Sequence, residues 1–215
     1  ESSTSLKRTA SPASGSYRPN PALGAGGIAT LRTGLAGSVG TAGRGAWIEI
    51  DLEGGLGGRD YGQGRGRIQG VLPAPGGRFE LRGQAGGTVG TPPPHRLFTL
   101  GGRGTLPGEP FRAWGGTALL LGRVDWVLGA RVPFPKLGSY PALKDPVTLG
   151  PFAALGWVGG QSPVAAWRPD GGVRPVVGVA VELLFGLVRI EAGWALRSSR
   201  IGIVVDAAPG WWPIL

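Results

Sequence analysis

From residue 28 onward, hydrophobic and polar positions alternate along the chain. The clearest stretch is TALLLGRVDWVLGARVPF at residues 117–134. Its even-numbered positions are apolar or glycine throughout, whereas its odd-numbered positions carry Arg123, Asp125 and Arg131. Successive side chains of a β-strand point to opposite faces of a sheet, so this pattern predicts a strand with one apolar face and one charged face.

The same alternation recurs on both sides of this stretch, and no helical period competes with it. It is strong at residues 46–53, 78–89, 187–197 and 200–206, and weaker at residues 28–39, 66–72, 147–158 and 173–184. The pattern predicts an all-β chain of about nine strands, many of them joined as antiparallel hairpins. Residues 1–27 are rich in Ser, Pro and Gly without periodicity, which predicts a leader or linker ahead of a β domain at 28–215.

Alternation is shared by soluble β-sandwiches and membrane β-barrels, and three features favour an antiparallel transmembrane β-barrel. Several predicted strands reach about 10 residues, which suits a tilted strand that crosses a bilayer. The charged face carries both signs on nearly every strand, as expected where arginines and carboxylates pair in a wet lumen. Tryptophans lie on or near the strands, where an aromatic belt would place them; they are Trp47, Trp126, Trp157, Trp194, Trp211 and Trp212.

The composition of the chain excludes several kinds of site. The chain has no Cys and one His, so disulfides, thiolate chemistry and multi-histidine metal sites are excluded. No apolar run of about 18 residues is present, which excludes a transmembrane helix. The net charge of +9 suits nucleic acid, anionic lipid or a basic pore lining. Because the arginines alternate with apolar residues along strands and do not cluster, nucleic-acid binding is disfavoured.

The stretch LGGRGTLPGEPFRAWGG, residues 100–116, raises the question of a phosphate-binding loop. A dinucleotide fingerprint needs a third glycine and a following helix, but Gly102-Arg103-Gly104 is followed by Thr-Leu-Pro and then by a strand pattern. The phosphate-binding interpretation therefore fails.

The same stretch resembles the sixth extracellular loop of BamA-type outer-membrane assembly barrels, the bacterial surface-antigen superfamily. Leu100-Gly101-Gly102 is similar to the loop opening of that family, and Phe111-Arg112-Ala113-Trp114 is similar to its Arg-Gly-aromatic tip. The resemblance implies a loop at 91–116 that folds into the barrel lumen, organised by Gly101, Gly102 and Phe111, with Arg112 as the lumen-reaching arginine. The C-terminal DAAPGWWPIL is also similar to the aromatic-rich end of an outer-membrane barrel.

The order of elements agrees with the C-terminal half of such a barrel, with about four strands before the loop and five after it. The family has about 16 strands, an even number as bacterial barrels require. Nine is odd, so either the weak strand around Arg65–Leu72 is miscounted or closure needs a partner. A small barrel is the alternative. The resemblance implies that Arg200 to Asp206 form the closing strand, with Ile201, Ile203 and Val205 on its apolar face.

One position departs from the family pattern. In the family, a Phe-x-Asp-x-Gly strand supplies an aspartate to the loop arginine, but the matching segment here is Phe152-Ala153-Ala154-Leu155-Gly156. Because Ala154 removes that carboxylate, Arg112 is expected to use Asp125, Glu182, Glu191 or water instead.

The resemblance implies a bacterial outer-membrane protein that inserts or translocates proteins without a cofactor and is not an enzyme. The implied partners are outer-membrane lipid, unfolded outer-membrane proteins, or a chain that supplies the missing strands. Two alternatives stay open: a structural or surface-exposed barrel without insertase activity, and a soluble all-β binding module.

Two further groups of residues are of types that can take part in catalysis or bind a cation. His95, in TPPPHR, is interpreted as a solvated loop histidine because a catalytic triad needs partners that the sequence does not identify. Glu49, Asp51 and Glu53 share one strand face and are compatible with an acid–base pair or a cation site. The favoured interpretation is that these carboxylates face arginines of adjacent strands.

Overall fold

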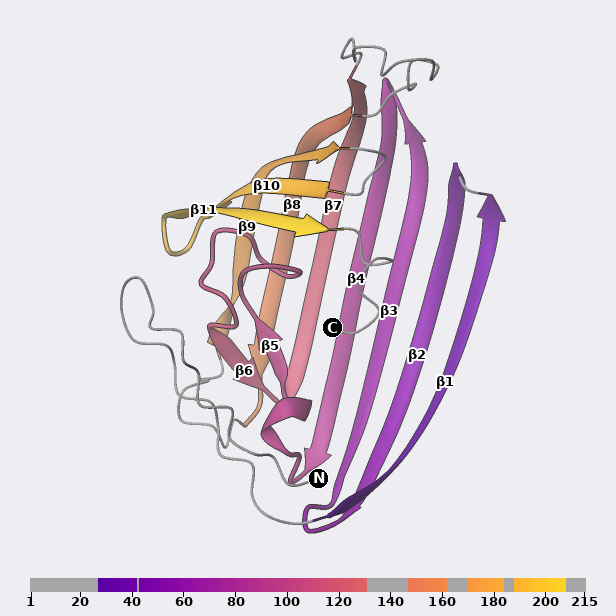
Figure 1. Ribbon diagram of the computed structural model, residues 1–215, viewed down its shortest axis with the longest axis vertical. Coiled ribbons are helices and arrows are strands. Elements are labelled where there is room, and N and C mark those ends of the chain that lie inside the picture. Colours follow the sequence, from indigo (N-terminus) through magenta and orange to yellow (C-terminus); the bar gives the residue numbers. More distant parts are fainter. Residues whose placement is uncertain (1–26, 42, 131–146, 162–169, 184–187, 208–215) are drawn as a thin grey trace, which may run out of the picture.

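The computed structural model describes residues 27–41, 43–130, 147–161, 170–183 and 188–207. In these residues a single nine-stranded antiparallel sheet forms in the order β1-β2-β3-β4-β7-β8-β9-β10-β11, with β5 and β6 as a separate two-stranded sheet (Figure 1). The strands are β1 (Ile28–Thr41), β2 (Arg44–Gly57), β3 (Tyr61–Ala74), β4 (Gly77–Gly90), β5 (Phe98–Leu100), β6 (Trp114–Gly116), β7 (Ala118–Ala130), β8 (Val147–Gly159), β9 (Asp170–Leu183), β10 (Val188–Ala195) and β11 (Arg200–Ala207).

The all-β prediction is confirmed, with four sheet strands before the glycine-rich stretch and five after it. The weak segment around Arg65–Leu72 lies inside β3, a strand of 14 residues, so it was not miscounted. The first seven sheet strands have 13 or 14 residues, and β10 and β11 have 8 each. The segment 1–26, residues 131–134 of the predicted long strand, Trp211, Trp212 and the C-terminal end lie outside the described residues.

The one helix among the described residues is a short 3-10 turn, η1 (Pro94–Arg96). Within the described part of the chain, no helix is both long and apolar enough to cross a membrane.

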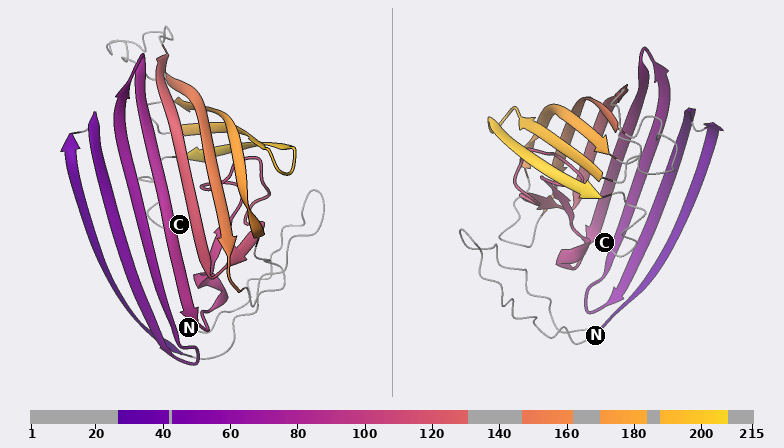
Figure 2. Two further views of the ribbon diagram at one scale, coloured as in Figure 1. Left: turned by 180° about the vertical axis from the view of Figure 1, so that it is seen from behind. Right: turned by 45° about the horizontal axis from the view of Figure 1, so that its top comes forward.

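Within the described residues the sheet is open. β1 pairs with β2, β11 pairs with β10, and no pairing joins β1 to β11. The expectation of a small closed barrel is therefore not met by these nine strands, whose two edges stay apart (Figure 2). The odd number of strands gives a physical reason for the open sheet. In an antiparallel sheet of nine strands the two edge strands run in the same direction, so they cannot complete an antiparallel ring with each other.

The register divides the side chains cleanly between two faces. Cross-strand partners such as Leu35 and Ile50, or Leu81 and Val124, place hydrophobic residues on one face, which we call the outer face. Between the terminal residues of every described strand, the outer face carries no Lys, Arg, Asp or Glu. It holds exposed large hydrophobics from the first strand to the last, including Leu31 at 79% exposure and Ile201 at 77%.

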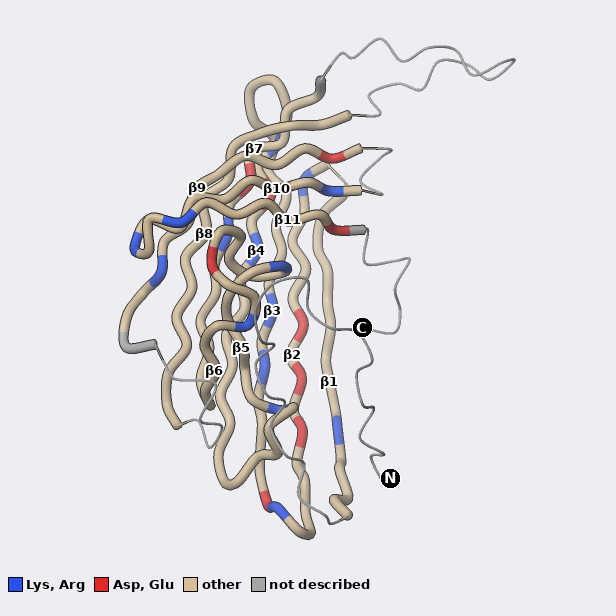
Figure 3. Tube along the Cα trace, turned by 60° about the vertical axis from the view of Figure 1, so that its left-hand side comes forward, with Lys and Arg blue, Asp and Glu red and all other residues tan. Residues whose placement is uncertain are grey.

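The opposite face, which we call the inner face, carries the charged side chains that pair across the strands. Figure 3 marks where the charged residues lie along the chain. The sheet curls toward this face, most strongly over β8 and β9 (Figure 2). Small residues make the bend possible: a Cβ at Gly150 would lie 1.6 Å from the Trp126 carbonyl oxygen, and one at Gly178 would lie 2.1 Å from that of Ala192. The curl brings β10 over the inner side of β7.

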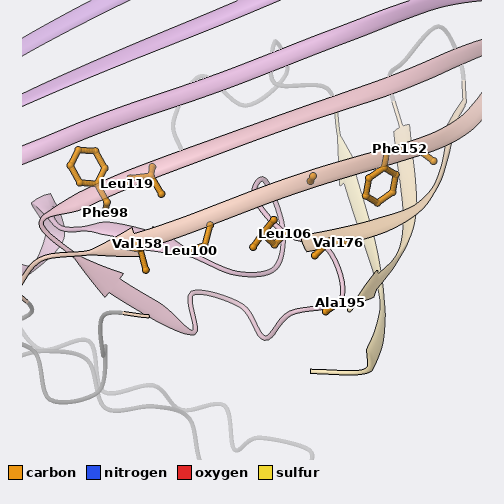
Figure 4. Close-up of a cluster of buried hydrophobic side chains, with 10 residues drawn as sticks. Phe98, Leu100, Leu106, Leu119, Phe152, Val158, Val176 and Ala195 are labelled. Carbon is orange, nitrogen blue, oxygen red and sulfur yellow. The ribbon is translucent and has the colours of Figure 1, made fainter. Parts of the chain in front are cut away.

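The buried core lies inside the curl and is small. Leu119, Phe152, Val158 and Val176 supply it from the strands, and side chains of the segment that follows β4 complete it (Figure 4). The core therefore sits between the sheet and this segment, and the outer face has no second layer within the described residues.

Candidate functional site: the inner face and its loop

The segment between β4 and β7 lies against the inner face of the sheet. It runs through η1, forms the β5–β6 hairpin and then leads into β7 (Figure 1). Leu100 and Leu106 are completely buried in the core cluster with Val158 and Val176 (Figure 4). A Cβ at Gly156 would lie 2.7 Å from a Leu100 methyl group, so a glycine on β8 makes room for the loop.

The four loop residues selected from the sequence come together. The backbone N–H of Arg112 donates to the Gly101 carbonyl at 2.9 Å, and a Cβ at Gly102 would lie 2.8 Å from the Cα of Phe111. Gly101 and Gly102 have φ of 117° and 73°, a left-handed backbone that favours glycine. The opening and the tip of the loop are thus the two sides of one tight structure that spans residues 100–113.

Arg112 and Phe111 lie on the exposed side of this structure. Phe111 is 61% exposed, and the Arg112 guanidinium carbon stands 5.1 Å from the centre of its ring. Arg112 has φ of 47°, which is uncommon for a residue other than glycine.

The carboxylates considered as acceptors for Arg112 belong to a network between β7 and β10. Arg123 on β7 donates to Asp125 at 2.7 Å and to Glu191 at 3.2 Å. Arg189 on β10 bonds to Asp125, Glu182 and Glu191. These side chains are at most 18% exposed, so the network is largely desolvated.

Ala154 lies beside this network but belongs to the hydrophobic core. It is 2% exposed, its cross-strand partner on β7 is Arg123, and the Arg123 guanidinium stacks 4.0 Å from the centre of the Phe152 ring. The position where the family pattern has an aspartate is therefore packed as an apolar site.

The loop places its own carboxylate in the interior, and sequence reasoning missed it. The Glu109 side chain is 1% exposed, accepts a hydrogen bond from Nη1 of Arg174 on β9 at 3.1 Å, and accepts another from the Ser198 hydroxyl at 3.1 Å. Arg174 also stacks 3.6 Å from the centre of the Trp114 ring. In the sequence, Glu109 is one carboxylate in a proline- and glycine-rich stretch, and no pattern pairs it with a residue 65 positions away.

The three carboxylates of β2 face arginines of neighbouring elements, as interpreted from the sequence. Arg67 on β3 lies 2.6 Å from Glu49, Arg32 on β1 lies 2.8 Å from Asp51, and Arg96 on η1 lies 2.9 Å from Glu53; Tyr61 also bonds to Glu53. No cluster of His, Cys, Asp and Glu able to hold a metal ion occurs in the described part of the chain.

A cavity of about 490 Å³ with many charged lining residues lies on the inner face. The loop contributes Gly104 and Thr105, and strands from β3 to β11 supply the rest. Its charged lining is balanced between arginines and carboxylates: Arg67, Arg82, Arg123, Arg189, Glu80, Glu182, Glu191 and Asp206. Such a lining suits water and polar solutes but carries no strong preference for either sign of charge.

His95 lies on η1 and is exposed. Partial burial, followed by the charge of Arg96, lowers the pKa of His95 below its usual range. The imidazole is thus favoured in its neutral form near pH 7.

The predicted closing strand corresponds to β11, which is an edge strand. Ile201, Ile203 and Val205 lie on the outer face with exposures of 77%, 72% and 61%. Asp206 points to the inner side and accepts a hydrogen bond from Nε of Arg103 in the loop at 2.9 Å. Among the described strands, β11 pairs with β10 alone, and closure against another strand stays a prediction.

Comparisons with protein-family models and with curated proteins give no match to this sequence. The geometry of the two faces and of the loop is therefore the evidence that bears on function.

Proposed function

We propose that this chain is part of an outer-membrane β-barrel that inserts or translocates proteins, with its outer face against lipid and its inner face lining the lumen. The observation that carries the membrane location is the distribution of charge over the strands. On the outer face no charged residue interrupts the described strands between their ends, whereas the inner face carries arginines and carboxylates in ion pairs. A soluble sheet normally buries its apolar face, but here no described residue covers that face and its large hydrophobic side chains are exposed.

The dimensions of the strands support the same location. Seven of the nine sheet strands have 13 or 14 residues and exceed the roughly 9–11 residues that a tilted transmembrane strand needs, whereas β10 and β11, with 8 residues each, are shorter than this. Phe79 and Trp126 pack together on the outer face near one end of β4 and β7, with ring centres 5.8 Å apart. Aromatic residues near strand ends are typical of the interface belts of membrane barrels.

The odd number of strands limits how many further strands this sheet needs for closure. Antiparallel closure needs an even total, so a nine-stranded sheet must be completed by an odd number of further strands. We propose that these strands come from another part of the polypeptide or from another chain, and that they pair with β1 and β11. Outer-membrane lipid is the remaining partner.

The role in protein insertion or translocation rests on the resemblance and on two features that accord with it. The loop at 91–116 lies on the side of the sheet that would be the lumen, and its glycine-rich opening and aromatic tip meet. Within the described residues, β1 and β11 each have one unpaired edge at which a strand of a substrate could add.

The membrane location is tested by attaching a fluorophore to single introduced cysteines, which is straightforward because the chain has no Cys. Ile68→Cys and Gln69→Cys are a matched pair of neighbours on β3: Ile68 lies on the outer face, 53% exposed, and Gln69 on the inner face, also exposed. In phosphatidylcholine vesicles, a quencher attached to the lipid chains is expected to quench the probe at position 68 and to spare the probe at 69. Equal quenching at both positions, with a monodisperse chain in detergent-free buffer, would instead identify a soluble β module.

A structural barrel without insertase activity is the second candidate, and Ala154 favours it. With Ala154 buried in the core, the loop is fastened by Glu109 and Arg174, so the ion pair that the family uses is not available at this position. The two candidates are separated by measuring how fast an unfolded outer-membrane protein folds into liposomes that contain the chain. Acceleration supports insertion or translocation, and an unchanged rate supports the structural role.

A further inference from the structure

The loop backbone touches the last two strands of the sheet at three glycines. A Cβ at Gly108 would lie 2.6 Å from the Gly193 carbonyl oxygen, and one at Gly193 would lie 2.4 Å from that of Pro107. A Cβ at Gly202 on β11 would lie 2.9 Å from the Cα of Gly108. Any larger residue at these positions would push the loop away from β10 and β11, so the contact depends on all three.

Glu109 fastens the loop beside this contact. Its buried carboxylate holds Arg174 on β9 with one oxygen and the Ser198 hydroxyl with the other. Ser198 lies in the turn that joins β10 to β11. Since both bonds involve an ionised group, they are stronger than neutral hydrogen bonds, and one side chain connects the loop to β9 and to the final hairpin.

Arg103 makes a third connection, at the far end of β11. Its guanidinium bonds to Asp206, 103 positions away in the sequence. The loop therefore reaches β11 at the preceding turn, near its middle at Gly202, and near its end at Asp206.

We propose that the loop segment 101–113 is a clamp that holds the β10–β11 hairpin in its curled position, and that Glu109 is the positioning residue that fastens it. In the described sheet β11 is an edge strand that pairs with β10 alone, along 8 residues, so contacts with the loop add to a short pairing. The clamp supplies these contacts from the inner side and leaves the backbone edge of β11 open. The clamp exists whether or not the sheet lies in a membrane, whereas its consequence, control of the edge where a further strand pairs, rests on the proposed function.

The clamp is tested by hydrogen–deuterium exchange of the full chain, read by mass spectrometry. In Glu109→Gln, the amides of β10 and β11 are expected to exchange at least about 10-fold faster, while those of β2 and β3 keep their wild-type rates. The matched control is Glu49→Gln, which removes an inner-face carboxylate that pairs with Arg67 on β3 and not with a loop residue, and exchange of β11 should stay unchanged. Unchanged β11 exchange in Glu109→Gln, or equal acceleration of every strand, would overturn the proposal.

A milder variant covers the case in which Glu109→Gln does not fold. Arg103 is 44% exposed, so Arg103→Ala leaves the core intact. It is expected to accelerate exchange at the C-terminal end of β11 and to spare the turn at Ser198; no change at β11 would count against the clamp. The labelling experiment at position 68 tests the membrane location and does not depend on the loop. The proposed function and the clamp can therefore fail independently of each other.

Discussion

The Arg189 guanidinium on β10 bonds to the Asp125 carboxylate on β7, although β8 and β9 lie between these strands in the sheet. A flat sheet would keep the two residues about 14 Å apart, since neighbouring strands are spaced by roughly 4.8 Å. The contact therefore requires the sheet to curl until β10 lies over β7. It forms because the inner face of β8 and β9 holds glycine and alanine at the bend, and because both charges gain partners that offset the cost of burial.

Replacing Asp125 by Asn tests whether this network maintains the curl. The carboxylate is 3% exposed and bonds to both Arg123 and Arg189, so its loss removes one ion pair from each of two largely buried guanidinium groups, which keep Glu182 and Glu191 as partners. Breaking a buried ion pair from one side costs about 3–5 kcal/mol. Because both arginines keep other carboxylates, we expect a smaller loss of about 1–3 kcal/mol in the free energy of unfolding, measured by urea titration in detergent micelles.

Glu80→Gln is the control for the Asp125 variant. Glu80 also bridges two arginines, but Arg78 and Arg82 are 43% and 40% exposed, so water screens their charge once the carboxylate is gone. The expected loss is below about 1 kcal/mol. An equally large effect at both positions would mean that the curl does not depend on the β7–β10 contact.

Gly150→Ala is expected to disrupt the pairing of β7 with β8. The added Cβ would lie 1.6 Å from the Trp126 carbonyl oxygen, which can be relieved only by moving backbone. Overpacking of this kind costs about 1–3 kcal/mol or more. Thermal unfolding followed by circular dichroism measures the change.

Gly122→Ala provides the comparison on the neighbouring strand. Nothing lies within 4 Å of a Cβ at Gly122, which faces outward on β7. Alanine there reduces the flexibility of the unfolded chain and is expected to be neutral or stabilising by about 0.5–1 kcal/mol. If Gly150→Ala were as well tolerated as Gly122→Ala, the bend would not require glycine.

The strands were predictable because alternation is a local property. In 78–89 and 187–197 the alternation within each strand distinguishes its two faces, and the register confirms that the uncharged faces of the nine strands lie on the same side of the sheet. Closure was not predictable, since it depends on the edges: β1 and β11 carry the same alternation as the inner strands, and only their pairing reveals that they are edges.

The loop shows where sequence reasoning reached its limit. Gly101, Gly102, Phe111 and Arg112 were selected by resemblance, and they do meet, because the chain reverses between them. The buried ionic contact of the loop is instead made by Glu109, whose partners Arg174 and Ser198 are 65 and 89 positions away. Such pairings arise from the curl of the sheet and leave no local pattern.

His95 allows a test of pH dependence outside the strands. Its pKa is lowered in the folded chain, so the unfolded chain binds the proton more readily. Stability from this group is therefore complete above the unfolded pKa of about 6.5 and declines as the pH falls below it. His95→Gln should flatten the pH dependence of the urea midpoint between pH 7 and 5; an unchanged slope would show that the histidine titrates equally in both states.

Ala154→Asp introduces the aspartate that the BamA-type pattern, which this segment resembles, has at the matching position, and we expect it to destabilise the chain. The side chain is 2% exposed in the core cluster, and its neighbour Arg123 already serves Asp125 and Glu191. A carboxylate added there has no uncommitted partner in the network, so several kcal/mol are lost unless it binds a proton. Urea titration at pH 7 measures the loss, with Ala154→Ser as the control for size and polarity without charge. A variant as stable as the wild type, with slower exchange at Arg112, would show that the loop can move to bring its arginine to the aspartate.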